Sequence, residues 1–381
     1  MPKLRVALVA LYPAPGAKAP GGVRVVVQNL VQVLRTYEDL QIELIHCHSD
    51  IEQDAVVQDG SIRVHYLAMP RRRVVPNTLA SIGRVQRVLQ TLKPDVVNAH
   101  GPHYAIAALR SGLPTIYTIH GVMHREAEVY RSLWFDRLRY VLERACDRYA
   151  VQHVHEIVAI SPYVLQEYAG WTAARFHRID NPLPNEYFEL AGTEEPMRLL
   201  YPGTIDERKN VLGLLEAVAL VRKQLPHVRL HIAGRATSPQ YAKKLEDAID
   251  AQGLSNHVSL LGLLSQSELL QEYARCAVVV LASHEETAPM AVLEAMAVGR
   301  PVVATRVGGV ADLVEDGRSG FTVPAGDMRT FAERLVTLLT DAELRRTMGR
   351  HARTLAERFH AERIAAQYRQ LYYQVAGKGL P

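Results

Sequence analysis

Two carboxylates, Glu286 and Glu294, bracket seven uncharged small and apolar residues just after a predicted buried strand, Ala277–Ala282. Pro289 suits the first turn of a helix, where its missing N–H costs nothing. The free amides of Ala288–Ala291 can then hold a diphosphate. A carboxylate that faces phosphate is repelled, whereas one that faces sugar hydroxyls is a bidentate acceptor. The stretch predicts a site for a sugar diphosphate; the alternative is that Glu294 is only an early-helix acid favoured by the dipole.

Two adjacent cations, Arg208 and Lys209, follow another predicted strand and precede Asn210, which suits the N-cap of a helix beginning at Val211. Ligands bind beyond the carboxyl ends of strands in open α/β sheets, and two cations beside a positive helix end attract phosphate. The pair therefore predicts a phosphate clamp, with a solvated loop pair as the alternative.

The N-terminal half places glycine and histidine after its strands. Gly21 and Gly22 open a helix, where backbone amides can approach an anion, and His120 ends a strand before a glycine. His100 is a weaker case of the same kind. A flexible turn and a structural histidine are the alternatives. Because the G-x-G-x-x-G fingerprint is absent, a nicotinamide or flavin enzyme is disfavoured.

Buried strands alternate with helices through most of the chain, which predicts an α/β fold with parallel sheets in two Rossmann-like domains facing each other across a cleft. The expected strands are Arg5–Leu11, Ile42–Cys47, Ile62–Leu67, Asp95–Ala99, Thr115–His120, Glu156–Ile160, Phe176–Ile179, Arg198–Tyr201, Val228–Ile232, Val258–Leu261, Ala277–Ala282 and Pro301–Ala304. The expected helices of the first half are Val23–Leu34, Leu79–Leu92, Leu133–Ala150 and Pro162–Tyr168.

Prolines and asparagines at Asn181–Asn185 break this order, and a polar stretch follows. We expect an N-terminal domain over residues 1–188, a second over 189–360, and a C-terminal helix within 361–381. From Asp341 onwards the sequence predicts helices and no strands.

Bulk composition excludes several classes of protein. The 381 residues carry a net charge of only +4, which argues against a nucleic-acid binder. Cys47, Cys146 and Cys276 have neither disulfide nor zinc spacing, so we expect buried thiols. No run is long enough to span a membrane, and the apolar start is too short for a signal peptide. We expect a cytoplasmic protein.

The stretch "EETAPMAVLEAMAVGRPVVATRVGGVADLVEDGRSGFTVPAGD" resembles the donor-site signature of family 4 glycosyltransferases, retaining enzymes of the GT-B fold. Glu286 and Glu294 match the E-x7-E motif of that family. The similarity also covers the Gly21-Gly22 loop, His120-Gly121, "VAISPYV", "YPGTIDERKN", "LHIAGR" and "LLGLLSQSEL".

The resemblance implies a role for each matching residue. Arg208 and Lys209 would hold the donor diphosphate, Glu294 the ribose hydroxyls and Glu286 the transferred sugar, near which His120 would lie. Residues implied to contact the donor through their backbone, or to approach it, are Gly22, Gly203, Leu264, Thr287, Ala288, Pro289, Met290 and Ala291. The N-terminal domain would bind the acceptor, and the last helix, Ala361–Ala376, would cross back to it.

The implied reaction moves a hexose from a UDP- or GDP-sugar to an acceptor hydroxyl of a glycan or lipid-linked acceptor, with the anomeric configuration kept. Charge that builds on the diphosphate would be stabilised by the two cations and the helix amides, without a metal or other cofactor. Departures from the family pattern are Thr204 in place of Arg, Thr287-Ala288-Pro289 in place of Gly-Phe-Gly, and Asp312 in place of Glu. Family donor preferences therefore cannot be copied.

Other classes of protein remain open at this point. A nucleotide-sugar epimerase of the same fold would release free products without an acceptor. A two-lobed solute-binding protein would need an export signal. A transferase-like protein without activity fits poorly with the presence of both acids and both cations.

A basic stretch, Arg63–Lys93, contains no acid and seven cations: Arg63, Arg71, Arg72, Arg73, Arg84, Arg87 and Lys93. Apolar residues recur within it at helical spacing and predict a stripe packed on the sheet. The exposed cations are compatible with peripheral attachment to anionic lipid at the inner membrane face. A solvated basic face is the alternative.

Overall fold

The computed structural model describes residues 3–13, 21–69, 77–129, 134–190 and 192–381. It divides into two compact units, one formed by residues 1–182 with 361–381 and the other by residues 183–360. Each unit is an α/β layer structure, as predicted, and its sheet is parallel apart from one antiparallel edge pair in the first unit. The free thiols Cys47, Cys146 and Cys276 are all buried, which confirms that expectation.

The first unit contains a sheet with the strand order β3-β4-β2-β1-β5-β6-β7-β8. Neighbours are parallel except for the antiparallel pair β3 and β4. The strands are β1 (Leu4–Val9), β2 (Leu40–His48), β3 (Ala55–Asp59), β4 (Ile62–Ala68), β5 (Val96–Ala99), β6 (Thr115–Ile119), β7 (Glu156–Ala159) and β8 (Arg175–Arg178). All seven strands expected here are confirmed, with small shifts at their ends.

Strand β3 was not predicted, because it lacks the burial that gives a strand its sequence signal. Val56 is 62% exposed and Val57 36% exposed, and the strand lies at the edge of the sheet. An exposed edge strand is held mainly by its ladder with one neighbour, so its side chains carry no strict alternation.

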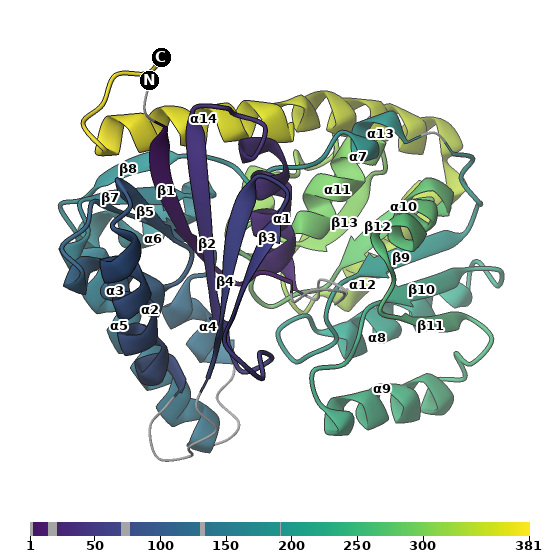
Figure 1. Cartoon of the computed structure of the whole chain (residues 1–381). Coiled ribbons are helices and arrows are strands. Elements are labelled where there is room, and N and C mark those ends of the chain that lie inside the picture. Colours follow the sequence, from purple (N-terminus) through teal and green to yellow (C-terminus); the bar gives the residue numbers. More distant parts are fainter. Residues whose placement is uncertain (1–2, 14–20, 70–76, 130–133, 191) are drawn as a thin grey trace. The chain divides into compact units, whose positions relative to one another are not determined.

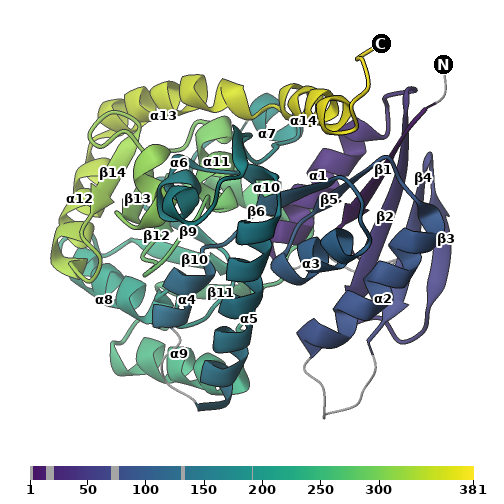
Figure 2. The same ribbon diagram turned by 90° about the vertical axis from the view of Figure 1, so that its left-hand side faces the viewer.

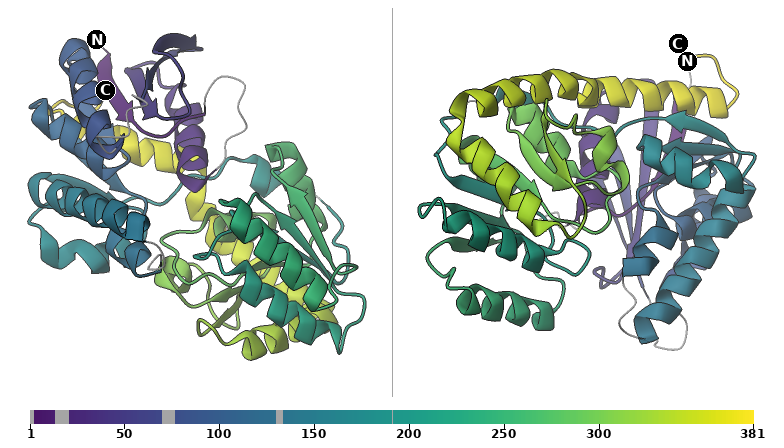
Figure 3. Two further views of the ribbon diagram at one scale, coloured as in Figure 1. Left: turned by 90° about the horizontal axis from the view of Figure 1, so that it is seen from below. Right: turned by 180° about the vertical axis from the view of Figure 1, so that it is seen from behind.

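Helices cover both faces of this sheet. They are α1 (Gly22–Leu34), α2 (Asn77–Leu92), α3 (Pro102–Arg110), α4 (Met123–Val129), α5 (Trp134–His153), α6 (Pro162–Tyr168), the 3₁₀ turn η1 (Ala169–Trp171) and α14 (Ala361–Val375). Helix α3 contacts α2 and α5 on one side of the sheet, whereas α1 contacts α14 on the other (Figures 2 and 3). Helix α3 was missed, because its buried residues are mostly alanines.

The terminal helix α14 is fixed to the first unit by buried polar contacts (Figure 1). The Asn98 amide donates to the Tyr372 hydroxyl at 3.0 Å, and Asn98 in turn accepts from Thr118 at 2.8 Å. Nearer the surface, the Asp39 carboxylate accepts from Arg369 at 2.9 Å and from Tyr373 at 2.8 Å. The chain thus returns to its first unit after leaving the second.

The second unit contains a fully parallel sheet with the strand order β11-β10-β9-β12-β13-β14. The strands are β9 (Arg198–Pro202), β10 (Arg229–Ala233), β11 (Val258–Gly262), β12 (Val278–Leu281), β13 (Val302–Thr305) and β14 (Gly320–Val323). The helices are α7 (Glu186–Glu189), α8 (Val211–Arg222), α9 (Pro239–Ala251), α10 (Gln266–Arg275), α11 (Met290–Val298), η2 (Gly308–Asp312), α12 (Met328–Thr340), α13 (Ala342–Ala356) and η3 (Glu357–Phe359).

Two hydrophobic cores flank this sheet, one with α8, α9 and α12 and the other with α10, α11 and α13. The second core also contains Tyr187 and Phe188 of α7, which are 3% and 5% exposed. The sequence predicts these two residues in the N-terminal domain, residues 1–188. They belong to the second unit, since their aromatic rings are buried there, and the division falls after Pro182.

None of the helices in the described ranges combines the length with the apolar character that a membrane crossing requires.

The contact between Asn98 and Tyr372 predicts a measurable loss of stability. In Tyr372→Phe the buried Asn98 amide loses its hydroxyl partner, which costs about 1–3 kcal/mol of unfolding free energy. The control Arg369→Met removes a partly exposed ion pair and costs at most about 1 kcal/mol. Urea denaturation of both variants measures the difference, and equal midpoints would contradict the account.

Candidate functional site

Two loops meet at the carboxyl edge of the second sheet, because β9 and β12 are neighbours there. The first follows β9 and carries Arg208 and Lys209, and the second follows β12 and leads into α11. The His284 amide donates to the Arg208 carbonyl at 2.7 Å, and the Arg208 guanidinium donates to the Glu285 carbonyl at 2.9 Å. These bonds fix the two loops to each other.

Asn210 ends the first loop as the N-cap of α8, as predicted. It has a left-handed φ of 49°, and its side-chain oxygen accepts from the Gly213 amide at 3.2 Å. Its side-chain amide donates to the Ala282 carbonyl of the second loop at 3.2 Å. The Lys209 amide donates to Asp206 at 2.9 Å. Asn210 therefore fixes the start of the helix, and Asp206 holds the backbone of Lys209.

Glu286, in the second loop, accepts hydrogen bonds from both loops and is only 3% exposed. It accepts from the Lys209 ammonium at 2.5 Å, from the Ser283 hydroxyl at 2.7 Å and from Arg208 at 3.5 Å. Burial raises the pKa of this carboxyl, but the charges of Lys209 and Arg208 outweigh burial and hold the pKa below its ordinary value. The three residues form one charged cluster, and this contact between the predicted phosphate clamp and the predicted sugar ligand was not expected from the sequence.

Glu294 lies eight residues later, inside α11, in a different environment. It is 6% exposed and accepts from the Tyr273 hydroxyl of α10 at 2.6 Å. Burial raises its pKa to about 7, and hydrogen bonds from Tyr273 and Tyr187 only partly offset that rise. The rings of the two tyrosines meet edge to face at 5.9 Å. Sequence reasoning missed both tyrosines, because spacing alone does not single them out among the 17 in the chain.

Helix α11 begins at Met290, with Pro289 as its N-cap, close to the predicted start. Amides at the very start of a helix have no partner one turn earlier in the ladder, and in α11 the Val292 amide is the first to bond back, to the Pro289 carbonyl at 3.0 Å. Thr287 and Pro289 are buried, whereas Ala288 and Met290 are partly exposed. The Glu286 carbonyl accepts from the Gly309 amide at 2.8 Å, which ties this loop to the segment after β13. Ala291 and its neighbours through Val298 are all buried, so the helix is a rigid support.

Gly203 follows β9 and Leu264 follows β11, on either side of β10. A Cβ on Gly234, which follows β10, would lie 1.7 Å from the Gly203 carbonyl oxygen, so the segments after β9 and β10 approach too closely for any side chain at Gly234. Leu264 is partly buried against the core that contains α11 and precedes the capping box of α10 at Ser265. The structure thus places both residues without testing their predicted donor contacts.

Gly22 and His120 belong to the first unit. Gly22 opens α1 after Gly21, whose φ is 100°, and a Cβ on Gly22 would meet nothing within 4 Å. His120 follows β6, and its Nε2 lies 2.8 Å from Nδ1 of His100. Burial lowers the pKa of His120 to about 4 and that of His100 well below its ordinary value. Both rings are therefore neutral at pH 7, and the pairing of His120 with His100 was not predicted.

One cluster with the spacing of metal ligands occurs in the part of the chain that the structure describes: His46, His48 and Asp50 in the first unit. The Arg24 guanidinium pairs with the Asp50 carboxylate at 2.5 Å. Nδ1 of His46 lies 3.1 Å from the Tyr12 amide and 3.3 Å from the Ala10 carbonyl, and Nε2 lies 3.1 Å from Asp50. Because a guanidinium and two imidazoles already surround the Asp50 carboxylate, the arrangement favours an ion-pair network over a metal centre.

Comparison with known proteins agrees with this architecture. Residues 20–186 match the family described as Glycosyltransferase Family 4, and residues 185–355 match the family described as Glycosyl transferases group 1. The chain is a family 4 glycosyltransferase of the GT-B fold. The expected family and fold class are thereby confirmed.

This glycosyltransferase is similar over most of its length to several proteins. It is 28% identical to the putative glycosyltransferase EpsD of Bacillus subtilis, over 83% of this chain and 88% of EpsD. It is also 28% identical to a D-inositol 3-phosphate glycosyltransferase of Paenarthrobacter aurescens, over 92% of each chain.

Solved structures show the same fold. Sucrose-phosphate synthase from Thermosynechococcus elongatus superposes with a TM-score of 0.85 at 20% identity, over 98% of this chain and 100% of that one. HepE of Anabaena, in complex with UDP-glucose, superposes with a TM-score of 0.74 at 20% identity, over 97% and 100%.

The pKa of Glu294 predicts a pH-dependent gain of stability in Glu294→Gln. Below pH 4.5 the carboxyl is protonated in both the folded and unfolded states, so it contributes nothing. As pH rises from 4.5 to about 7 the unfolded state ionises first, and the wild type loses stability. Because the variant has no carboxyl to ionise, it avoids this loss, and above pH 7 its free energy of unfolding should exceed that of the wild type by up to about 3 kcal/mol. Urea denaturation of Glu294→Gln and wild type at pH 5 and pH 8 measures this gain. The same difference in unfolding free energy at both pH values would contradict the raised pKa of Glu294.

Glu286→Gln is the matched control, because this substitution should lower the free energy of unfolding at high pH instead of raising it. It leaves Lys209 and Arg208 without their buried counter-charge, which costs about 3 kcal/mol or more of unfolding free energy at pH 8. Because the pKa of Glu286 is lowered, the wild-type advantage fades as pH falls through that pKa.

Proposed function

We propose that this glycosyltransferase moves a hexose from a nucleoside diphosphate sugar to an acceptor hydroxyl with retention of the anomeric configuration. The observation that supports this proposal most strongly is the cluster of Lys209, Arg208 and Glu286, in the two loops that precede α8 and α11. It puts two cations and one buried acid within bonding distance of each other, in the loops after two neighbouring strands. Sites of this kind in α/β sheets bind phosphate-bearing ligands.

The cations stabilise the charge that develops on the departing diphosphate. Lys209 and Arg208 are held in place by Glu286 and by the backbone, so they need little reorganisation when that charge forms. Amides in the first turn of α11 add partial positive charge at the same end of the unit. Glu286 keeps the cations fixed and accepts from a hydroxyl of the transferred sugar.

Glu294 binds the ribose in this proposal. Its carboxyl is already held by two tyrosine hydroxyls, which leaves the remaining acceptor capacity for the two ribose hydroxyls. Ionised carboxylate is the better acceptor, so the donor binds best when Glu294 has lost its proton. UDP-glucose, the ligand of HepE, is the first donor to test, and a GDP-sugar is the second.

The acceptor is a glycan or lipid-linked hydroxyl held by the first unit, which carries Gly22 and the neutral His120. Attack from the face that the diphosphate leaves, with a phosphate oxygen taking the acceptor proton, needs no protein nucleophile. A nucleotide-sugar epimerase would instead release free sugar and nucleotide with no acceptor present, so mass spectrometry of the products separates the two reactions.

Lys209→Ala should lower turnover at least about 100-fold, because the diphosphate loses a preorganised cation in the transition state. Lys243→Ala is the matched control, since Lys243 is 75% exposed and pairs with Asp247 at the surface. Initial rates of nucleotide release with a UDP-sugar and an acceptor mixture measure both variants. Equal rates for the two variants would remove Lys209 from the site.

Chelation should leave turnover within about twofold of its untreated value, since fixed cations replace the metal at the diphosphate. The same assay, run after dialysis against EDTA and then with added Mg²⁺ or Mn²⁺, tests this directly. Activity that vanishes with EDTA and returns only with the metal would overturn the metal-independent mechanism.

Peripheral contact with anionic lipid remains a second proposal for the basic stretch Arg63–Lys93. Arg71, Arg72 and Arg73 lie outside the described residues. Arg84 pairs with Asp54, and Arg63 lies 3.4 Å from Glu43, so acids elsewhere in the unit neutralise part of this charge.

Co-sedimentation with vesicles tests the lipid contact. Binding should require anionic lipid, weaken with salt and fall when Arg71, Arg72 and Arg73 are replaced by Ser, at about 1 kcal/mol per cation. Replacing Arg318 and Arg329, exposed arginines of the second unit, is the control. Equal partitioning onto neutral and anionic vesicles, or none, would leave a solvated basic face.

A further inference from the structure

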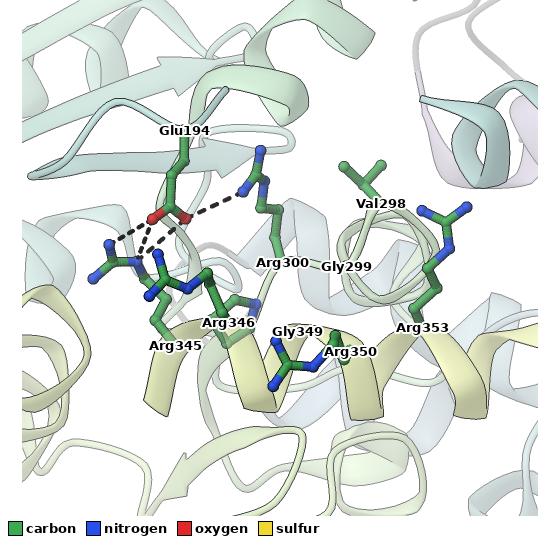
Figure 4. Close-up of a pocket in the computed structure, with 10 residues that line it drawn as sticks. Glu194, Val298, Gly299, Arg300, Arg345, Arg346, Gly349, Arg350 and Arg353 are labelled. Atoms are coloured by element: carbon green, nitrogen blue, oxygen red, sulfur yellow. Dashed lines mark hydrogen bonds and ion pairs between the residues drawn. The ribbon is translucent and has the colours of Figure 1, made fainter. Parts of the chain in front are cut away.

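A pocket of about 260 Å³ lies within the second unit, between the C-terminal end of α11 and one face of α13 (Figure 4). Five of its ten lining residues are arginines and one is an acid. The arginines are Arg300, Arg345, Arg346, Arg350 and Arg353, and the acid is Glu194. None of these belongs to the predicted donor site.

Two of the arginines form hydrogen bonds with other residues that surround the pocket. Arg345, 3% exposed, bonds Glu194 at 2.6 Å and the Leu338 carbonyl at 2.6 Å. Arg300 bonds the other oxygen of Glu194 at 3.2 Å and the carbonyls of Tyr273 and Ala274. Figure 4 shows Glu194 between these two guanidinium groups. The single acid is thus already shared by two cations, which leaves the pocket with surplus positive charge.

The other three arginines project from α13 and have only weak or neutral partners. Arg346 pairs with Glu343 at 3.0 Å on the solvent side, and Arg350 bonds Thr347 at 2.9 Å and lies 3.5 Å from Glu343. Arg353 donates to the Phe188 carbonyl. Exposed pairs one helical turn apart are worth a fraction of a kcal/mol, so an anion can replace them at little cost.

Close packing of the two helices shapes the pocket. A Cβ on Gly349 would lie 2.1 Å from the Gly299 carbonyl, so α13 touches the end of α11 here without an intervening side chain. The arginines on either side of Gly349 are thereby brought to the rim of one concave surface. A larger residue at Gly349 would push the rim away from its floor.

We propose that this pocket is a binding site for a small anion that carries one or two phosphate groups. A guanidinium fork matches phosphate oxygens in a bidentate way, and several forks around one cavity select phosphate over a single carboxylate. The volume is below the roughly 300–1,000 Å³ of pockets that enclose drug-sized ligands, so the ligand is smaller than a nucleotide sugar. The site is separate from the proposed donor site and does not depend on it.

Supporting contacts of the pocket determine which residues a test can change. Arg300 bonds the backbone of Tyr273, whose hydroxyl holds Glu294, and Arg353 bonds the residue after Tyr187. Substitution of either arginine would disturb Glu294 as well. Arg346 and Arg350 have no such contact among the described residues, and both are well exposed, at 57% and 66% of the side chain.

Isothermal titration with inorganic pyrophosphate at low salt tests the proposal on the full chain. Wild type is compared with Arg346→Gln/Arg350→Gln, and with the control Arg318→Gln/Arg329→Gln. The control removes the same charge from exposed arginines that also pair with a nearby acid. The pocket variant should bind pyrophosphate about tenfold more weakly or worse, and the control within about twofold of wild type.

Lys209→Ala separates this site from the proposed donor site, which also attracts pyrophosphate. Binding that survives in Lys209→Ala and falls in the pocket variant supports the proposal, whether or not sugar transfer is later found. Equal affinity in the pocket variant and its control would overturn it. Absence of binding to wild type, or loss only in Lys209→Ala, would overturn it too.

Discussion

The buried ion pair between Lys209 and Glu286 is the interaction on which the rest of the candidate site depends. A carboxylate that is 3% exposed is stable in its charged form only with well-placed partners, and here an ammonium, a hydroxyl and a guanidinium supply them. The pair links the loops after β9 and β12, which are adjacent only because β9 is the central strand from which the sheet extends in both directions. Sheet topology therefore creates the site, and the bond from the Lys209 amide to Asp206 holds the backbone of the lysine beside it.

Two acids only eight residues apart have pKa values that are shifted in opposite directions. Lys209 and Arg208 keep Glu286 ionised, whereas Glu294 is surrounded by tyrosine hydroxyls and apolar side chains, and burial raises its pKa to about 7. Environments that push the pKa values of paired carboxyls apart give each a different chemical task. In the proposed reaction the ionised acid fixes the cations and the sugar, and the second acid recognises the ribose. A single glutamate-to-glutamine change can therefore have opposite effects on stability at the two positions.

The sequence predicted the parts of this arrangement that rest on local pattern. Buried parallel strands are continuous runs of Val, Ile and Leu, and the positions just after them located Arg208, Lys209, Glu286 and His120. Strand β14 (Gly320–Val323) was missed, because a four-residue strand that starts with glycine gives little signal. The edge strand β3 was missed because it is exposed. Contacts between distant segments could not be predicted from one sequence, and the tyrosines that hold Glu294 and the partner of Glu286 are of that kind.

A structure of the protein with a bound nucleoside diphosphate sugar tests the central claim most directly. We expect diphosphate oxygens to contact Lys209, Arg208 and the first-turn amides of α11, with the ribose hydroxyls on Glu294. The Lys209 ammonium should then be shared between Glu286 and a phosphate oxygen. A donor bound elsewhere, with the pair between Lys209 and Glu286 untouched and no ribose hydroxyl on Glu294, would contradict it.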